Sequence, residues 1–354
     1  MSIQTLFSPF NYKKLSLQNR FVMAPMTRAF AANGIPDENI KGYYERRAAG
    51  EVGLILTEGT VVERPSSKNI ETIPNFYGAQ ALNGWKNVLE AVHRKGGKIA
   101  PQIWHVGNTP YQWTPPAPFE SPDTMTLEDI ENTIQAFANA AKSAKDLGFD
   151  ALEIHGAHGY LIDQFFWEGM NHRTDDFGGK TLKERSKFAI DVVKAMRQTV
   201  GPDFVIILRL SQWKQQDYTV KLAKTPAELE NWILPLVDAG VDIFHGSQRR
   251  YWDPEFEGSD LNFAGWLKKV SGQPTITVGS VGLEKDSADV FTNPESKSSP
   301  ASLDELVRRF ERGDFDLVAV GRAVLQDPNW VKKVHQQKFD ELTTFEAKSL
   351  ATLS

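Results

Sequence analysis

Two histidines and a tyrosine, His155, His158 and Tyr160, follow a short apolar run that begins at Ala151. A neutral imidazole N–H is a hydrogen-bond donor, and a phenol can donate a proton near neutral pH. Two donors beside one acid suit the reduction of a polarised double bond, in which a substrate oxygen gains negative charge and a neighbouring carbon is protonated. A lone histidine or tyrosine near a strand is more often structural. Three such residues at this spacing favour a catalytic role.

Eight apolar, β-rich runs could carry such residues at their ends. The predicted strands are Phe21–Met26, Val52–Thr57, Ile99–Trp104, Ala151–Ile154, Phe204–Leu210, Asp242–Phe244, Thr275–Val278 and Leu317–Val320. Amphipathic stretches between them predict helices. Such helices include Gly84–Lys95, Leu127–Leu147, Leu182–Val200, Ala227–Ala239 and Leu303–Arg312.

Apolar strands that alternate with helices indicate a parallel sheet covered on both faces. The count of eight favours a (β/α)8 TIM barrel, and a doubly wound open sheet is the alternative. We expect a single domain over residues 1–354. Its extended loops, Val106–Asp123 and Gln248–Phe263, would overhang the C-terminal face of the barrel, where barrel active sites form.

Composition excludes several classes of protein. The chain has no cysteine, which excludes disulfides, thiolate nucleophiles, iron–sulfur clusters and thiolate zinc sites. A net charge of −5 with scattered lysines and arginines offers no basic stripe for a nucleic acid. There is no run of about twenty apolar residues for a membrane span and no secretory signal at the start. We therefore expect a cytoplasmic monomer or homodimer that binds small molecules, and neither nucleic acid nor membrane.

The residues that close the strands of such a barrel meet at one face. This set offers no lysine for a Schiff base and no His-x-His pair on the first strand for a metal, so we expect no metal site. Gly279-Ser280 and Gly321-Arg322 follow the last two strands, where barrels often bind phosphate through backbone N–H groups and a cation. Two glycine turns with a surface arginine are an equally weighted interpretation of these four residues.

Several motifs, in order and each at a predicted strand end, resemble the Old Yellow Enzyme family of FMN-dependent ene-reductases. The motifs are Phe21-Val-Met-Ala-Pro-Met-Thr-Arg28, Gln102-Ile-Trp104, Glu153-Ile-His-Gly-Ala-His-Gly-Tyr-Leu-Ile-Asp-Gln-Phe165, Asn171–Gly179, Arg209-Leu-Ser211 and Gly321-Arg322. The resemblance runs from about residue 5 to about residue 335, and a C-terminal tail follows it. Some members have Asn at the second histidine, so His158 indicates the His/His type.

The resemblance implies an FMN across the barrel mouth. In this likeness Thr27 would donate to flavin O4, and Arg209 would lie near N1 and O2, where the reduced ring is negative. Gly59 would pack on the ring and Gln102 would bind its pyrimidine edge. The implied cofactor-binding residues are Ala24, Pro25, Met26, Thr27, Gly59, Gln102, Arg209 and, around the phosphate, Gly279, Ser280, Gly321 and Arg322.

The same resemblance implies roles for the residues that meet the substrate. His155 and His158 would bind its carbonyl or nitro oxygen, hydride would pass from flavin N5 to the β-carbon, and Tyr160 would protonate the α-carbon. Trp104 would form part of the substrate pocket, with core packing as an equal alternative. NADH or NADPH would first reduce the FMN and leave, in a ping-pong sequence, before an enone, enal or nitro compound binds.

Two other functions are weaker candidates. A metal-dependent barrel hydrolase could use His155 and His158, but the other strand ends lack an ordered set of carboxylates. A flavin-binding protein without turnover would have no use for Tyr160 and the histidine pair. The sequence leaves open the physiological substrate, the choice between NADH and NADPH, the oligomeric state and the role of the 248–263 loop. Arg249 and Arg250 in that loop could select NADPH or cap helices.

Overall fold

Eight parallel strands close into a barrel in the computed structural model, which describes residues 2–286, 293 and 295–354. The strands are β3 (Phe21–Met23), β4 (Leu54–Val61), β5 (Lys98–Trp104), β6 (Ala151–His158), β7 (Val205–Lys214), β8 (Ile243–Ser247), β9 (Thr275–Val278) and β11 (Leu317–Val320). They follow one another around the barrel in chain order, and β11 pairs with both β9 and β3. The predicted TIM barrel is confirmed, and the alternative of an open sheet is wrong.

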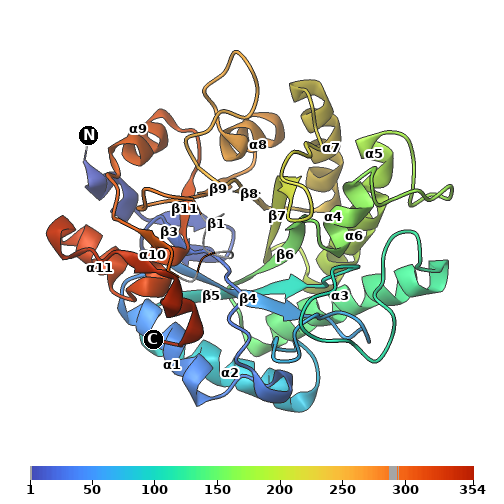
Figure 1. The fold of residues 1–354 in the computed structure, drawn as a ribbon, viewed down its shortest axis with the longest axis horizontal. Coiled ribbons are helices and arrows are strands. Elements are labelled where there is room, and N and C mark those ends of the chain that lie inside the picture. The colour runs from blue at the N-terminus through green and yellow to red at the C-terminus, as the bar shows by residue number, and fades with distance from the viewer. Residues whose placement is uncertain (1, 287–292, 294) are drawn as a thin grey trace.

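Helices surround the strands on the outside of the barrel (Figure 1). They are α1 (Glu38–Ala49), α2 (Ala79–Arg94), α3 (Leu127–Leu147), α4 (Leu161–Phe166), α5 (Leu182–Arg185), α6 (Lys187–Val200), α7 (Pro226–Ala239), α8 (Phe263–Ser271), α9 (Asp304–Arg312), α10 (Arg322–Gln326) and α11 (Trp330–His335). Smaller elements are the antiparallel pairs β1 (Phe10–Tyr12) with β2 (Leu15–Leu17) and β10 (Lys297–Ser298) with β12 (Phe345–Glu346), and the 3-10 turns η1 (Ile3–Phe7), η2 (Ala32–Gly34), η4 (Phe339–Glu341) and η5 (Ala347–Ala351).

The inside of the barrel is apolar towards the N-terminal ends of the strands. Alternate residues of each strand, such as Leu54 and Leu56 or Val205 and Ile207, belong to one buried cluster, as expected for side chains that point inward at every second position. The β1–β2 hairpin contributes to the same cluster. The Tyr12 hydroxyl of the hairpin donates to Gln273 Oε1, just before β9, at 2.9 Å. The hairpin therefore covers the N-terminal end, which leaves the opposite end for a site.

Local signals explain why α3 has the limits that were predicted. The Thr126 hydroxyl accepts from the Asp129 N–H at 3.0 Å and the Asp129 carboxylate accepts from the Thr126 N–H at 3.0 Å, which is a capping box. Gly148 ends α3 in the left-handed conformation, with φ of 93°. The predicted helix Leu182–Val200 is instead two helices, α5 and α6, that meet at Ser186.

Four strands, β4, β6, β7 and β8, run further than the sequence indicated, and β6 and β7 carry the site. The predicted strand Ala151–Ile154 continues to His158, with a register shift against β7 between Gly156 and His158. Its partner β7 continues to Lys214. Both His155 and His158 therefore belong to β6, so the hydrogen bonds of the barrel fix their backbone.

The tail after residue 335 packs against the barrel. Arg28 donates to the backbone carbonyls of Ser349, Leu350 and Thr352 at 3.4, 3.1 and 2.5 Å. Arg47 donates to the carbonyl of Ser354. The end of the chain is thus tied to residues that follow β3. None of the described helices is long and apolar enough to span a membrane.

Candidate active site

A layer of polar side chains lies above the apolar interior, towards the C-terminal ends of the strands. Gln102 Nε2 donates to Glu153 Oε1 at 2.8 Å, and His245 Nδ1 lies 2.6 Å from Glu153 Oε2. All three residues and Arg209 are buried. Glu153 and Gln102 come from neighbouring strands in register, as do Arg209 and His245. The barrel therefore gathers two of the predicted flavin ligands, Gln102 and Arg209, in one layer.

Two polar atoms of this layer are buried without any partner in the described chain, namely Arg209 Nε and His245 Nε2. Unpaired buried polar atoms are costly unless a ligand or water meets them. Burial also lowers the pKa of the Arg209 guanidinium from its usual value, although an arginine remains charged in proteins. Arg209 Nε is a donor, whereas His245 Nε2 is an acceptor, because Nδ1 of the neutral ring donates to Glu153. A polar ring edge that has both acceptors and a donor, such as the pyrimidine side of a flavin, fits these groups.

His155 is neutral, and a hydrogen bond from the backbone shows which ring nitrogen carries its hydrogen. Its Nδ1 accepts from the Ala157 N–H at 3.3 Å, so the imidazole hydrogen is on Nε2. Burial and then the charge of Arg209 hold the pKa of His155 well below its usual range. The ring stacks on Trp104 with 5.7 Å between ring centroids. His155 is thus a fixed neutral donor.

His158 adopts a backbone conformation that side chains rarely take, with φ of 65°. Its N–H donates to Ser211 Oγ at 2.9 Å, and its ring stacks on Trp213 with centroids 4.5 Å apart. Ring atom Nε2 lies 2.7 Å from Ser247 Oγ. Burial and the charge of Arg209 keep the pKa of His158 well below its usual range.

Tyr160 lies against Trp104 and His155. Its ring is edge-on to Trp104 and to His155, with centroid distances of 4.7 and 5.0 Å. The His155 and His158 rings are 5.2 Å apart. Gln215 Nε2 donates to Tyr160 Oη at 2.9 Å. Burial raises the pKa of the phenol, so Tyr160 keeps its proton near neutral pH. The structure therefore brings the three predicted catalytic residues and Trp104 together.

The segment after β3 is shaped by a buried carboxylate. Glu58 Oε2 accepts from the N–H groups of Arg28 and Ala29 at 2.9 and 2.8 Å, so Glu58 is paired and holds the backbone. Burial raises its pKa to about 7. These bonds hold the backbone directly after Ala24, Pro25, Met26 and Thr27. Of those four, Ala24 and Pro25 are buried and Thr27 is exposed, and the Thr27 hydroxyl has no partner among the described residues.

Gly59 and Trp104 form part of the same wall. A Cβ at Gly59 would lie 2.4 Å from Trp104 Cε3, so the indole occupies the space that a side chain would need. Glycine is required here because Trp104 approaches the backbone of β4, whether or not Gly59 also meets a cofactor.

The predicted phosphate residues come together after β9 and β11. Arg322 donates to the carbonyls of Asp286 and Lys285 at 3.0 and 2.5 Å and lies 3.5 Å from Ser280 Oγ. Burial lowers its pKa to about 10, so it remains a cation. A Cβ at Gly321 would meet only Met26 Sδ and Ala24 Cβ, at 3.5 and 3.8 Å. The open side of Gly321 beside a half-buried cation fits an anionic group.

The loop that follows β8 also reaches this region. Ser280 Oγ donates to the Arg249 carbonyl at 3.0 Å. The guanidinium groups of Arg249 and Arg250 both pair with the Asp286 carboxylate, at 2.9 and 2.8 Å. They do not act as helix caps in this arrangement, and their side chains lie beside the candidate phosphate site.

Sequence reasoning missed several residues of the site. Glu153 precedes the predicted His155 by one strand period, and alternation along β6 could have placed it. No site residue was predicted on β8, which contributes His245. Ser247 follows His245 by the same period. Gln215 and Trp213 were missed because they belong to the extension of β7 and the turn after it, which no apolar pattern indicates.

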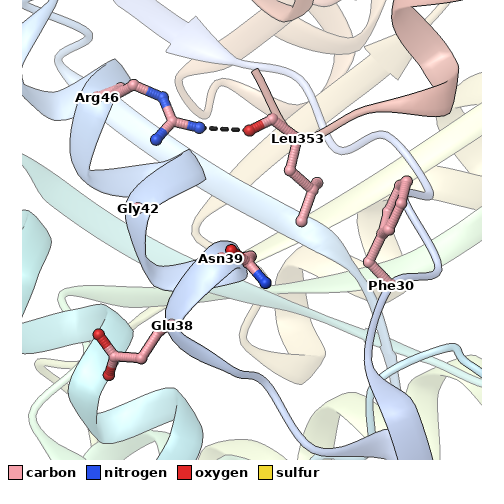
Figure 2. A pocket seen from close by; sticks show the side chains of 6 residues that line it. All are labelled: Phe30, Glu38, Asn39, Gly42, Arg46 and Leu353. Carbon is pink, nitrogen blue, oxygen red and sulfur yellow. Dashed lines mark hydrogen bonds between the residues drawn. The ribbon is translucent and has the colours of Figure 1, made fainter.

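A surface pocket of about 340 Å³ lies elsewhere, between α1, the segment after β3 and the end of the chain (Figure 2). There Arg46 donates to the Leu353 carbonyl. The pocket is lined by Phe30, Glu38, Asn39, Gly42, Arg46 and Leu353, none of which is a predicted site residue.

No three His, Cys, Asp or Glu side chains of the described ranges gather in a way that could hold a metal ion. The metal-hydrolase alternative therefore lacks a set of metal ligands within the described residues.

Comparison with known proteins identifies the family. The model of the NADH:flavin oxidoreductase / NADH oxidase family matches residues 5–297. 12-oxophytodienoate reductase 7 of Oryza sativa subsp. japonica is 30% identical over 93% of this chain and 87% of its own length. The NADH oxidase of Thermoanaerobacter brockii is 33% identical over 95% of this chain, which spans 52% of that protein.

Solved structures agree with these matches. Morphinone reductase in complex with tetrahydroNAD has 26% identity and a TM-score of 0.76, with 94% of this chain and 90% of that chain covered. An Old Yellow Enzyme homologue from Zymomonas mobilis shares the fold, with a TM-score of 0.79 at 22% identity over 99% of this chain and 97% of that chain. The chain belongs to the NADH:flavin oxidoreductase / NADH oxidase family, which includes the Old Yellow Enzymes, and is an FMN-dependent oxidoreductase with NADH or NADPH as hydride donor.

Proposed function

We propose that this protein is an ene-reductase that reduces the carbon–carbon double bond of α,β-unsaturated carbonyl or nitro compounds. The observation that carries the proposal is the cluster of His155, His158 and Tyr160, with ring centroids 5.0 to 5.2 Å apart between neighbours, at the open end of the barrel. Two neutral donors and one protonated phenol are what an enone needs when its β-carbon receives hydride.

The residues at the barrel mouth suit a bound FMN, which supplies the hydride from its N5 atom. Unpaired buried Arg209 Nε and His245 Nε2 support this proposal, as does the open side of Gly321 beside Arg322. The residues proposed to hold the cofactor are those predicted from the sequence: Ala24, Pro25, Met26, Thr27, Gly59, Gln102, Arg209, Gly279, Ser280, Gly321 and Arg322.

His155 and His158 would donate to the carbonyl or nitro oxygen of the substrate. Their pKa values are held well below the usual range by burial and by Arg209, so they act as neutral donors and are poor proton sources. Their donation stabilises the negative charge that develops on the oxygen when hydride adds to the β-carbon. Trp104, stacked on His155, would position the substrate from one side.

Tyr160 would supply the proton. Its O–H is free to point to the α-carbon because Gln215 Nε2 donates to the phenol oxygen and leaves the hydrogen unused. When the proton leaves, the same bond from Gln215 stabilises the phenolate. Net addition of H⁻ and H⁺ to the double bond balances the reduction.

Spectroscopy separates this proposal from the two alternatives. Purified protein should be yellow and should lack stoichiometric zinc, whereas a metal hydrolase would be colourless. Under anaerobic conditions NADPH or NADH should bleach the flavin, and 2-cyclohexenone should restore its colour. A flavin-binding protein without turnover would fail at the second step. Comparison of NADH with NADPH in the first step measures the donor preference.

Tyr160→Phe tests the assignment of the proton donor. Because Phe keeps the ring packing and lacks the acid, we expect flavin reduction by NADPH to change little and reoxidation by cyclohexenone to slow by roughly 10²- to 10⁴-fold. The two half-reactions are measured separately by anaerobic stopped flow. An equal loss in both would contradict the assigned role.

The proposed cytoplasmic location, single domain and monomer or homodimer are separate predictions.

A further inference from the structure

Ser247, the last residue of β8, lies between a cation and one of the proposed substrate donors. Its side chain is buried, with 3% of the residue exposed. Its Oγ is 2.7 Å from His158 Nε2 and accepts a longer bond from Arg209 Nη2 at 3.4 Å. Trp213 Nε1 donates to the Ser247 carbonyl at 3.3 Å, which ties the residue to the ring that stacks on His158.

The direction of the short bond follows from a count of donors. A guanidinium can only donate, so Arg209 uses a lone pair of Ser247 Oγ. The hydroxyl hydrogen of Ser247 then needs an acceptor, because a buried polar hydrogen without a partner is costly. Among the residues that the structure describes, His158 Nε2 is the acceptor within reach. The hydroxyl therefore donates to Nε2, and Nε2 carries no hydrogen.

His158 then has its single hydrogen on Nδ1. The ring is neutral, since burial and Arg209 both disfavour a second proton. Nδ1 has no partner within the described chain, and it is not one of the atoms that are both buried and unpaired, so it opens to solvent. His155 has the opposite arrangement, because its Nδ1 accepts from the Ala157 N–H and its hydrogen is on Nε2.

We propose that Ser247 is a positioning residue that fixes the hydrogen of His158 on Nδ1, so that Nδ1–H is the group that meets the substrate oxygen. The inference rests on the proposed ene-reductase function for its consequence, but the position of the hydrogen can be measured without turnover. Without Ser247, the Nε2–H form would compete, and a fraction of the enzyme would present a lone pair to the substrate in place of a donor.

The test uses the FMN-loaded protein in its oxidised state, labelled with ¹⁵N-histidine, at neutral pH and without substrate. Long-range ¹H–¹⁵N spectra distinguish the two neutral forms of each of the seven histidines. The signal of His158 is the one that His158→Asn removes. We expect the Nδ1–H pattern in the wild type, a shift towards Nε2–H in Ser247→Ala, and the wild-type pattern again in Ser247→Thr, which keeps the hydroxyl.

Ser211→Ala is the matched control, because Ser211 Oγ accepts from the backbone N–H of His158 at 2.9 Å and does not bond to the ring. Its His158 signal should keep the Nδ1–H pattern. A Nε2–H pattern in the wild type, or a pattern that Ser247→Ala leaves unchanged, would overturn the proposal.

Kinetics then connect the hydrogen to the reaction. We expect Ser247→Ala to slow reoxidation by cyclohexenone roughly 3- to 10-fold, about the effect of one lost hydrogen bond, with a smaller change in flavin reduction. If the wild type shows Nδ1–H but cyclohexenone never restores the flavin colour, the assignment of Ser247 stands and the proposed function fails. If Ser247→Ala shifts the hydrogen but not the rate, the role of Ser247 in the reaction is refuted.

Discussion

Removal of one partner of the buried ion pair between Lys214 and Asp163 should strongly destabilise the site. Lys214 Nζ lies 2.7 and 2.8 Å from the two carboxylate oxygens, and both side chains are 0% exposed. Asp163 Oδ2 also accepts from the Gly159 N–H at 2.7 Å, between His158 and Tyr160. Loss of one partner leaves an uncompensated buried charge, so we expect Lys214→Met to cost about 3–5 kcal/mol of unfolding free energy.

The pH dependence of this variant has a definite sign. Burial already raises the pKa of Asp163, and Lys214 opposes that shift. Without Lys214 the folded-state pKa rises further above the unfolded value of about 3.9. The folded variant therefore holds a proton that the unfolded chain has released, and its stability falls as the pH rises through that interval. The deficit relative to wild type should be smallest at low pH.

Urea denaturation of the FMN-loaded protein, followed by tryptophan fluorescence, measures the effect. Lys142→Met is the matched control, since its pair with Asp146 has side chains 66% and 56% exposed, and exposed pairs of this spacing contribute about 0.3–0.5 kcal/mol. Asp163→Asn combined with Lys214→Met should recover part of the loss, because a neutral amide oxygen can still accept from Gly159. A cost for Lys214→Met no larger than that for Lys142→Met would refute the reasoning.

Three further predictions concern the site. Since burial raises the pKa of Glu58 from 4.5 to about 7, the folded wild type should lose about 3 kcal/mol of stability as the pH rises across that interval. In Glu58→Gln, the midpoint of urea unfolding should depend less on pH. An unchanged pH dependence of the midpoint would contradict this. Gln215→Leu should raise the pKa of Tyr160 and slow enone reduction several-fold, whereas Gln216→Leu, which loses a bond to the Gly159 carbonyl, should leave the alkaline limb of the pH–rate profile in place. His158→Asn should retain more enone reduction than His158→Gln, because only Asn has its N–H as many bonds from the backbone as Nδ1; equal losses would argue for Nε2.

The fold was predictable because its signals are local. The strands β9 and β11 and the helix α3 have the limits that their apolar patterns and the capping Thr126 indicate. Closure of the barrel followed from a count of strands. By contrast α1 was missed, since its twelve residues include few apolar ones, and it is held by distant contacts such as the bond from Arg47 to the Leu325 carbonyl.

The site was predictable by residue type but not by connection. Motif order identified His155, His158 and Tyr160, yet their hydrogen-bond partners Ser247 and Gln215 lie 89 and 55 residues away along the chain. Such bonds depend on which strands become neighbours and on their register, including the shift between β6 and β7. A single sequence carries no local signal for that shift.

Burial gives the three proposed catalytic side chains different tasks. It lowers the pKa of both His155 and His158, and the charge of Arg209 acts in the same direction. Near neutral pH the histidines can therefore donate hydrogen bonds to a substrate oxygen without releasing protons. Burial raises the pKa of Tyr160, so the phenol keeps its proton until a carbanion-like carbon forms beside it, because only a strongly basic carbon can remove it. The same environment thus makes His155 and His158 poor acids and reserves proton transfer for Tyr160.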